Sequence, residues 1–341
     1  MLGKSNAAKL STPYRQVAAL FFAFLWGCGG GGGGGGGGGP AGLTPPPSTP
    51  VGVTASNATQ VSATALKPAV GGGGALTTVA GIETTAAPQT RAVTRALLAV
   101  ARDSKTQLSA SQSVVGAAAR TTPCKVSGSI TADISADGTS GTITFNACSD
   151  IAGETISGSA SATGVSAAPD GSHFSGNFRV DITFTVTGFA PLRIVGDFSI
   201  VENCNTSTHD CTSNFTGTSL GAQQGNETWF ITNFMIREAL VHNTQNNTQN
   251  VTVTFNYAVS STALNGSVTV STSTPFQMLT SARHPYTGVV VATGKNNSKV
   301  RLTVLGSDPT APGQVQIEVD ADGDNTYESS TLYSWSALDA L

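Results

Sequence analysis

The sequence predicts a mainly β protein, with an antiparallel, curled sheet or sandwich of about ten or more strands. One or two short helices and a disordered Gly/Pro-rich tether are expected to precede it. From Cys124 onward, apolar residues recur at every second position, as at the five positions Phe178, Val180, Ile182, Phe184 and Val186. The strands between turns are expected to be short, mostly of five to seven residues. Turn sequences separate these runs: Asp137-Gly138, Asp170-Gly171, Asn265-Gly266, Asn296-Asn297 and Asp322-Gly323. One-sided alternation with short turns is typical of antiparallel strands that bury one face.

Residues 1–27 have the features of an export signal. Lys4, Lys9 and Arg15 are basic, and the unbroken apolar run Val17–Trp26 follows them. At 1.5 Å per residue this run makes about 15 Å of helix, half of a bilayer's hydrocarbon thickness. A basic start and a short apolar core indicate a signal peptide.

The signal segment ends in Leu25-Trp26-Gly27-Cys28. A small residue before a cysteine, with Leu three positions upstream, resembles the lipobox of bacterial lipoproteins. The resemblance implies cleavage before Cys28, a diacylglycerol group on its thiol and a third acyl chain, such as palmitate, on the new N-terminus. Gly29 stands where that family places its inner-membrane retention Asp, which favours the outer membrane. The alternative is an ordinary signal peptide followed by a chance cysteine.

Residues 28–50 are expected to form the tether between lipid and folded body. Gly29–Gly39 is an unbroken glycine run, and glycine loses the most backbone entropy on ordering. Pro45-Pro46-Pro47 then favours extended polyproline II, so the segment reaches on the order of 25–40 Å. Signal peptide, cysteine and glycine run together resemble the uncharacterised Gram-negative lipoproteins with a polyglycine tether, a family that implies no activity.

The charge balance excludes some partners. The chain has 17 basic and 20 acidic residues, and loss of Lys4, Lys9 and Arg15 with the signal leaves 14 against 20, a net charge of −6. The mature chain contains no basic run. We therefore expect no nucleic-acid partner, and a membrane attachment that depends on the lipid anchor rather than on surface charge.

The four remaining cysteines predict disulfides, because an exported chain with an even number of them forms such bridges. Four cysteines allow three pairings. We favour Cys124–Cys148 and Cys204–Cys211, since each pair brackets a short loop or hairpin. A metal site on these cysteines has weak support, because the chain has no CxxC spacing.

Three segments are expected after the tether. Residues 51–122 are partly helical and partly flexible, with a short helix in Thr54–Leu66 and a stronger one in Thr90–Arg102. The second helix could pack on the sheet or act as a spacer, with its arginines on the solvated face. Residues 123–273 form the antiparallel β domain. Residues 274–341 form a C-terminal β subdomain that ends in an Asp-rich hairpin.

That hairpin carries the sharpest chemical signal. Asp320, Asp322, Asp324 and Glu328 alternate with small residues and resemble the first half of a DxDxDG calcium loop. Hard oxygen ligands in a tight turn suit Ca²⁺, so a structural calcium is one expectation. The alternative is a hairpin turn with solvated charges. No other cofactor is expected.

Gly217-Thr218-Ser219-Leu220-Gly221 matches the GxSxG pattern of serine hydrolases. A nucleophile elbow needs a buried strand before the serine and a helix after it, and turn-like sequences flank this one. The favoured function is therefore non-enzymatic: a lipid-anchored envelope protein with a structural role or an envelope protein partner. A carrier of a lipid or other apolar ligand in the curled sheet is the second hypothesis, and a hydrolase using Ser219 is the third.

Overall fold

The structure is a computed structural model that describes residues 42–68, 119–150, 152–168, 170–188, 190–208, 210–243, 248–279, 282, 284–308 and 313–339. Cys28, the glycine run and the predicted helix Thr90–Arg102 lie outside these residues. Within them, no helix is long and apolar enough to cross a membrane.

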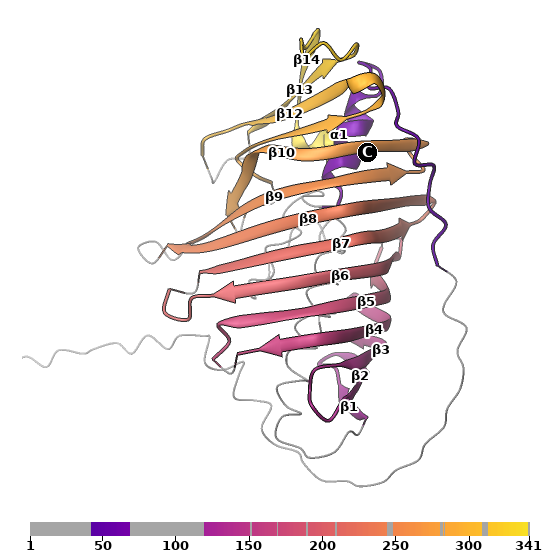
Figure 1. Cartoon of the computed structure of the whole chain (residues 1–341), viewed down its shortest axis with the longest axis vertical. Coiled ribbons are helices and arrows are strands. Elements are labelled where there is room, and N and C mark those ends of the chain that lie inside the picture. The colour runs from indigo at the N-terminus through magenta and orange to yellow at the C-terminus, as the bar shows by residue number, and fades with distance from the viewer. Residues whose placement is uncertain are drawn as a thin grey trace, which may run out of the picture. The chain divides into compact units, whose positions relative to one another are not determined.

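The described chain is built on one antiparallel sheet in which every strand pairs with the strands before and after it (Figure 1). The mainly β, antiparallel prediction is confirmed. The sheet is open, with β1 and β14 as its outermost described strands. The strands are β1 (Arg120–Pro123), β2 (Ser127–Ile134), β3 (Gly141–Ser149), β4 (Glu154–Ala167), β5 (His173–Val186), β6 (Leu192–Cys204), β7 (Cys211–Gln224), β8 (Glu227–Asn243), β9 (Thr248–Ser261), β10 (Gly266–Leu279), β11 (Thr287–Thr293), β12 (Lys299–Leu305), β13 (Gln314–Asp320) and β14 (Ser329–Tyr333).

One face of the sheet carries the core, and we call it the inward face. Along β5, buried and less buried side chains alternate almost without interruption, as period-two spacing requires. Neighbouring strands align their aromatic rings on this face: the Phe178 and Phe198 rings stack with centroids 5.2 Å apart, and those of Phe255 and Phe276 lie 5.7 Å apart. Such cross-strand pairs stabilise a sheet beyond the burial of their area.

The central strands are longer than the alternation alone indicated. The sequence suggested runs of five to seven residues, whereas β4 to β10 each span 13 to 17. The difference comes from bulges, which shift the apolar phase without ending the strand. At Asn233, for example, the backbone adopts φ 48° and the register between β8 and β9 shifts between Thr232 and Met235.

The helix expected in Thr54–Leu66 is present as α1 (Ala58–Leu66). It begins later than expected because Asn57 organises the preceding turn: its Oδ1 accepts a 2.8 Å hydrogen bond from the Thr54 N–H, and its Nδ2 donates to the Gly52 carbonyl oxygen. α1 packs against β9 to β13, and its residues Val61, Ala65 and Leu66 are buried.

The end of the predicted tether lies against the sheet. Pro50 forms a parallel bridge with Ser267, and the Val51 N–H donates to the Ser267 carbonyl oxygen at 3.0 Å. In return, the Ser267 N–H donates to the Thr49 carbonyl oxygen at 2.9 Å. The last residues of the predicted tether therefore pair with the sheet beside the start of β10.

The break expected at about residue 274 falls inside β10. This strand pairs with β9 on one side and β11 on the other, so the sheet runs continuously through that position. The chain then closes with α3 (Trp335–Asp339), which contacts α1. The Trp335 ring stacks on the buried His284 ring at 4.8 Å.

Candidate metal site and inward-facing acidic row

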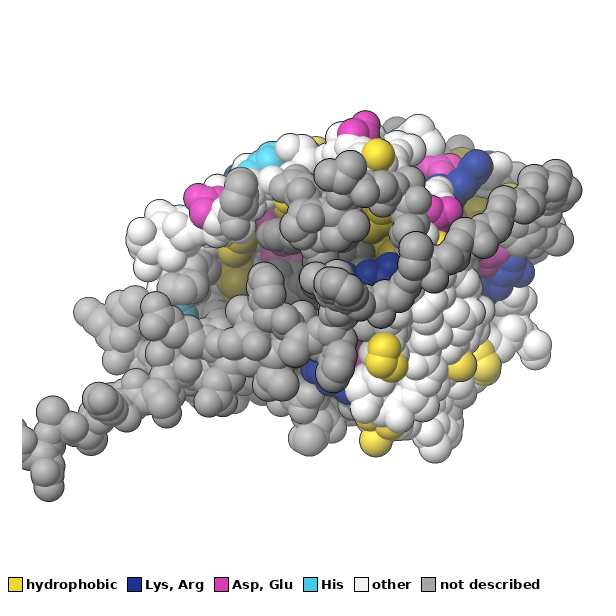
Figure 2. All heavy atoms as spheres, turned by 90° about the horizontal axis from the view of Figure 1, so that it is seen from below, with side chains coloured by type: hydrophobic (Ala, Val, Ile, Leu, Met, Phe, Trp, Pro, Cys, Tyr) yellow, Lys and Arg dark blue, Asp and Glu magenta, His cyan; other side chains and the backbone are white. Residues whose placement is uncertain are grey.

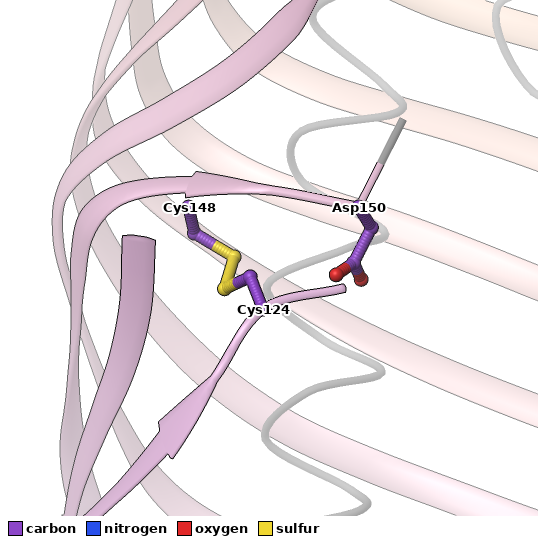
Figure 3. A group of neighbouring side chains, drawn as sticks. All are labelled: Cys124, Cys148 and Asp150. Atoms are coloured by element: carbon purple, nitrogen blue, oxygen red, sulfur yellow. A yellow bond between two sulfur atoms is a disulfide. The ribbon is translucent and has the colours of Figure 1, made fainter. Parts of the chain in front are cut away.

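The cysteines pair as expected, Cys124 with Cys148 and Cys204 with Cys211. The first disulfide ties the segment after β1 to the end of β3, and the second joins facing positions on β6 and β7. Asp150 lies beside the first pair (Figure 3). This group is not a metal site, because the sulfur atoms bond to each other and the Asp150 Oδ1 accepts the Lys125 N–H at 2.8 Å.

The Asp-rich hairpin brings its four acidic side chains together. Asp320, Asp322, Asp324 and Glu328 each offer a carboxylate oxygen within 4.8 Å of the others. Three of these side chains are exposed, whereas Asp320, at the end of β13, is 0% exposed. The arrangement fits the oxygen-only chemistry that calcium prefers, although clustered surface carboxylates also occur without an ion.

Protein donors already meet these carboxylates. The two Asp320 oxygens accept the N–H groups of Gly323 and Asn325 at 2.7 and 3.0 Å. The Glu328 Oε2 accepts the Ala321 N–H at 3.0 Å, and the Lys299 ammonium lies 3.9 Å from the Asp320 Oδ2. The hairpin therefore has an internal source of stability, and calcium binding stays a prediction.

A cationic side chain supports the same hairpin from β12. Arg301 donates two hydrogen bonds, of 2.8 and 2.9 Å, to the Glu318 carboxylate, and its guanidinium stacks over the Tyr327 ring at 4.1 Å. The hydrogen bonds with Glu318 raise the pKa of Arg301, and burial raises the pKa of Tyr327 against the opposing effect of Arg301. These contacts hold the loop against the sheet.

Ser219 of the GxSxG pattern lies in the middle of β7, between Asp197 on β6 and Thr232 on β8. β7 continues to Gln224 and connects directly to β8. Ser219 therefore lies within a continuous strand. The strand-to-helix turn that exposes the nucleophile in hydrolases is not formed at this serine.

The outward face carries a hollow of about 420 Å³ over β4 to β7. Its lining includes the exposed ion pair Arg179–Asp197, with 3.2 Å between Nε and Oδ1, and the hydrogen bond from Ser199 Oγ to Asn177 Oδ1 at 2.6 Å. Exposed pairs of this kind contribute little to stability. Seen from below, the described surface consists mainly of uncharged polar groups and backbone, with single apolar side chains between them (Figure 2).

Sequence reasoning missed an acidic row on the inward face. In β8, Glu238 occupies the same phase as the buried Ile236 and Leu240 and is only 2% exposed. Its neighbour across β7 is Ser213, whose own neighbour across β6 is Glu202. The Ser213 Oγ donates to the Glu202 Oε2 at 3.4 Å. The signal was present in the sequence, since an acid in an apolar phase marks a buried charge.

Glu202, Ser213 and Glu238 thus occupy facing positions on three adjacent strands, and we call this polar strip of the inward face the Glu202–Glu238 row. Comparison of the chain with family models, with curated proteins and with solved structures gave no match.

Proposed function

We propose that this protein is a lipid-anchored component of a Gram-negative cell envelope with a non-catalytic, structural or interaction role. Residues 28–50 act as the tether and the sheet acts as the rigid body. The observation that carries this proposal is the way the tether ends. It passes into a set of hydrogen bonds with the sheet rather than into a free loop.

Those hydrogen bonds join the end of the tether to two parts of the sheet. The Ser267 Oγ donates to the Ser48 carbonyl oxygen at 2.7 Å, next to the two backbone bonds at Ser267. Further along, the Lys295 N–H donates to the Val51 carbonyl oxygen at 2.7 Å, and the Val53 N–H donates to the Ser298 Oγ at 2.8 Å. A pull on the lipid end would thus load both β10 and the connection between β11 and β12, as expected for a body held at a fixed place.

The proposal is tested by following the full-length protein in a Gram-negative host that is fed labelled palmitate. We expect label on the wild-type chain and recovery of the protein in the outer-membrane fraction. Cys28→Ser should carry no label and should leave the outer-membrane fraction. Gly29→Asp is the matched variant: it should keep the label but move to the inner membrane. Absence of the palmitate label from the wild-type protein would contradict the proposal.

A carrier function is the second candidate, and the apolar inward face favours it. α1 packs against β9 to β13, whereas the main contacts of β2 to β8 with other described elements are with their neighbouring strands. A lipid or other apolar ligand on this part of the face would contact the aromatic side chains of β5 to β7, which pack together there. Native mass spectrometry of purified protein would detect such a ligand as an added mass that is lost on denaturation.

A further inference from the structure

The hollow on the outward face lies over β4 to β7, four strands that are paired on both sides (Figure 1). Interior strands of an antiparallel sheet give their backbone hydrogen bonds to their neighbours, so a ligand in this hollow would meet mainly side chains. The volume of about 420 Å³ falls within the range of small-molecule sites. The lining side chains therefore decide which ligand the hollow suits.

We propose that this hollow binds a short stretch of a neutral saccharide through side-chain hydrogen bonds. Its shape, its donors and acceptors, and the balance of its charges support this proposal. The site lies on the folded sheet and does not require the lipid anchor. Saccharide binding and palmitate labelling can therefore fail independently of each other.

Two shifts of strand register border the hollow. The pairing of β4 with β5 shifts between Thr163 and Ser166, and the pairing of β6 with β7 shifts between Asp197 and Ser199. Thr163, Asp197 and Ser199 all line the hollow. Bulges bend a strand and re-aim its side chains, and they are frequent beside binding sites. The two shifts thus interrupt the regular surface of the sheet on either side of the hollow.

Asn177 offers hydrogen-bond donors to a ligand in the hollow. Its Oδ1 accepts the Ser199 hydroxyl at 2.6 Å, which fixes the amide and leaves the Nδ2 group with its two N–H donors for other acceptors. Gly164 keeps this group accessible from β4, because a Cβ at that position would lie 3.4 Å from the Asn177 Nδ2. The Ser199 oxygen keeps its capacity to accept a hydrogen bond.

The charges of the hollow balance. Arg179 and Asp197 are the charged residues of its lining, and they pair with each other at 3.2 Å. Their side chains are 77% and 58% exposed, so a ligand can reach both. The guanidinium donates and the carboxylate accepts charge-assisted hydrogen bonds, and a hydroxyl group can meet either one. A ligand with many hydroxyls and no net charge matches this pair.

The spacing of the polar groups suits sugar rings. They form two rows of facing positions across the strands, about 4.8 Å apart within each row. One row is Ser161, Arg179 and Asp197, and the other is Thr163, Asn177 and Ser199. Successive hydroxyls around a sugar ring present donors and acceptors over similar distances, so one ring can contact both rows.

The same lining disfavours peptides and lipids. Peptides add to sheets at an unpaired edge, lie in aromatic or apolar grooves, or bring acidic groups to an arginine cluster. β4 to β7 are interior strands, and the single lining arginine is paired with Asp197. Phe178 and Phe198 line the hollow as well but are each only 2% exposed, so they offer little aromatic surface to an acyl chain.

Titration calorimetry of the full-length protein with chitotriose, cellotriose and maltotriose is the direct test. We expect at least one of these neutral trisaccharides to bind, with affinities at low and high salt that agree within about twofold, because salt screens charged ligands. Absence of binding by all three up to about 10 mM would overturn the inference. A weakening of about tenfold or more at high salt would also overturn it.

Single substitutions locate the bound sugar. Arg179→Ala and Asn177→Ala should each weaken binding about tenfold, because each removes hydrogen-bond donors. Arg237→Ala on β8 and Asn256→Ala on β9 are the matched controls, since both residues are exposed and lie outside the hollow. The controls should keep the wild-type affinity. If the four variants bind alike, the sugar lies elsewhere and the inference fails.

A steric substitution tests the site without removing the Arg179–Asp197 pair or Asn177. Thr163→Trp would place a large ring in the hollow and should abolish binding, whereas Thr269→Trp, at an exposed position on β10, should not. Thermal unfolding of each variant shows whether the fold is kept. Trialanine is the peptide control. Trialanine binding that matches the best trisaccharide and is lost in Thr163→Trp would assign the hollow to peptides and overturn the inference.

Discussion

The phenol of Tyr257 donates a 2.6 Å hydrogen bond to the carbonyl oxygen of Ala65, so β9 holds the last turn of α1. Tyr257 is 1% exposed. Tyr257→Phe removes the donor and leaves a buried helix carbonyl oxygen without this partner. We expect the free energy of unfolding to fall by about 1–3 kcal/mol. Urea titration of the two proteins at neutral pH measures the difference, and equal midpoints would contradict it.

The same residue predicts a loss of stability at high pH. Burial raises the pKa of Tyr257 well above its ordinary value, whereas in the unfolded chain the phenol ionises near pH 10. Stability from this group is therefore complete below about pH 10. Above that pH it falls, by up to about 1.4 kcal/mol per pH unit, as the pH approaches the folded value. Urea titrations from pH 9 to 11 should show a shallower decline for Tyr257→Phe than for wild type.

The two disulfides should differ in their contribution. Cys124–Cys148 spans 24 residues and Cys204–Cys211 spans 7. By loop-closure entropy, the paired serine substitutions should lower the free energy of unfolding by about 3.5 kcal/mol for the first and about 2.5 kcal/mol for the second. Unfolding of both variants under oxidising conditions provides the comparison. A larger loss from the short loop would show that local geometry outweighs chain entropy.

Gly288 at the start of β11 should not tolerate a side chain. Its φ is 140°, and a Cβ there would lie 2.5 Å from the Phe276 Cδ1 and 2.8 Å from the Phe276 Cα. Because the closest atoms include backbone, a ring rotation cannot relieve the clash. Gly288→Ala should cost about 2–4 kcal/mol of stability. Gly171→Ala, at φ 78° with no atom within 4 Å, is the control and should cost about 1 kcal/mol from strain alone.

Calcium binding by the Asp320–Glu328 hairpin is tested by thermal unfolding with calcium or with a chelator. At 10 mM calcium, a site with a dissociation constant of about 1 mM would add about 1.4 kcal/mol. We expect that increase in the wild type and none in Asp322→Asn/Asp324→Asn. Asp320→Ala separates the two roles of the loop, since it removes backbone hydrogen bonds and should destabilise the protein with or without calcium. Identical unfolding in calcium and chelator would contradict the metal prediction.

Alternation and turn sequences predicted the architecture because both are local properties of a strand. Every expected turn falls at a connection between consecutive strands, for example Asn265-Gly266 between β9 and β10. Strand length was not predictable, because bulges such as that at Asn233 change the phase. The continuity of the sheet through Thr274 depends on pairing with β9 and β11, which no local pattern contains.

The candidate sites, too, were predictable only where their residues are close together in the sequence. The cysteine pairs were predictable from short loops, and the Asp-rich hairpin was predictable as a cluster. The cations that support the hairpin were not predictable, since Lys299 and Arg301 come from another strand, β12. The Glu202–Glu238 row needed the register of three strands to appear, although Glu238 alone stood out as an acid among apolar neighbours.

The sequential order of the strands has a consequence for how the protein is made. Each strand's partner on one side has already been synthesised when the strand emerges, so pairing can advance hairpin by hairpin as the chain is made. Contacts between near neighbours in sequence lower the entropic barrier to folding. The same order means that duplication or deletion of one hairpin would widen or narrow the sheet without changing the order of the other strands. The width of such a sheet can therefore change in steps of two strands during evolution.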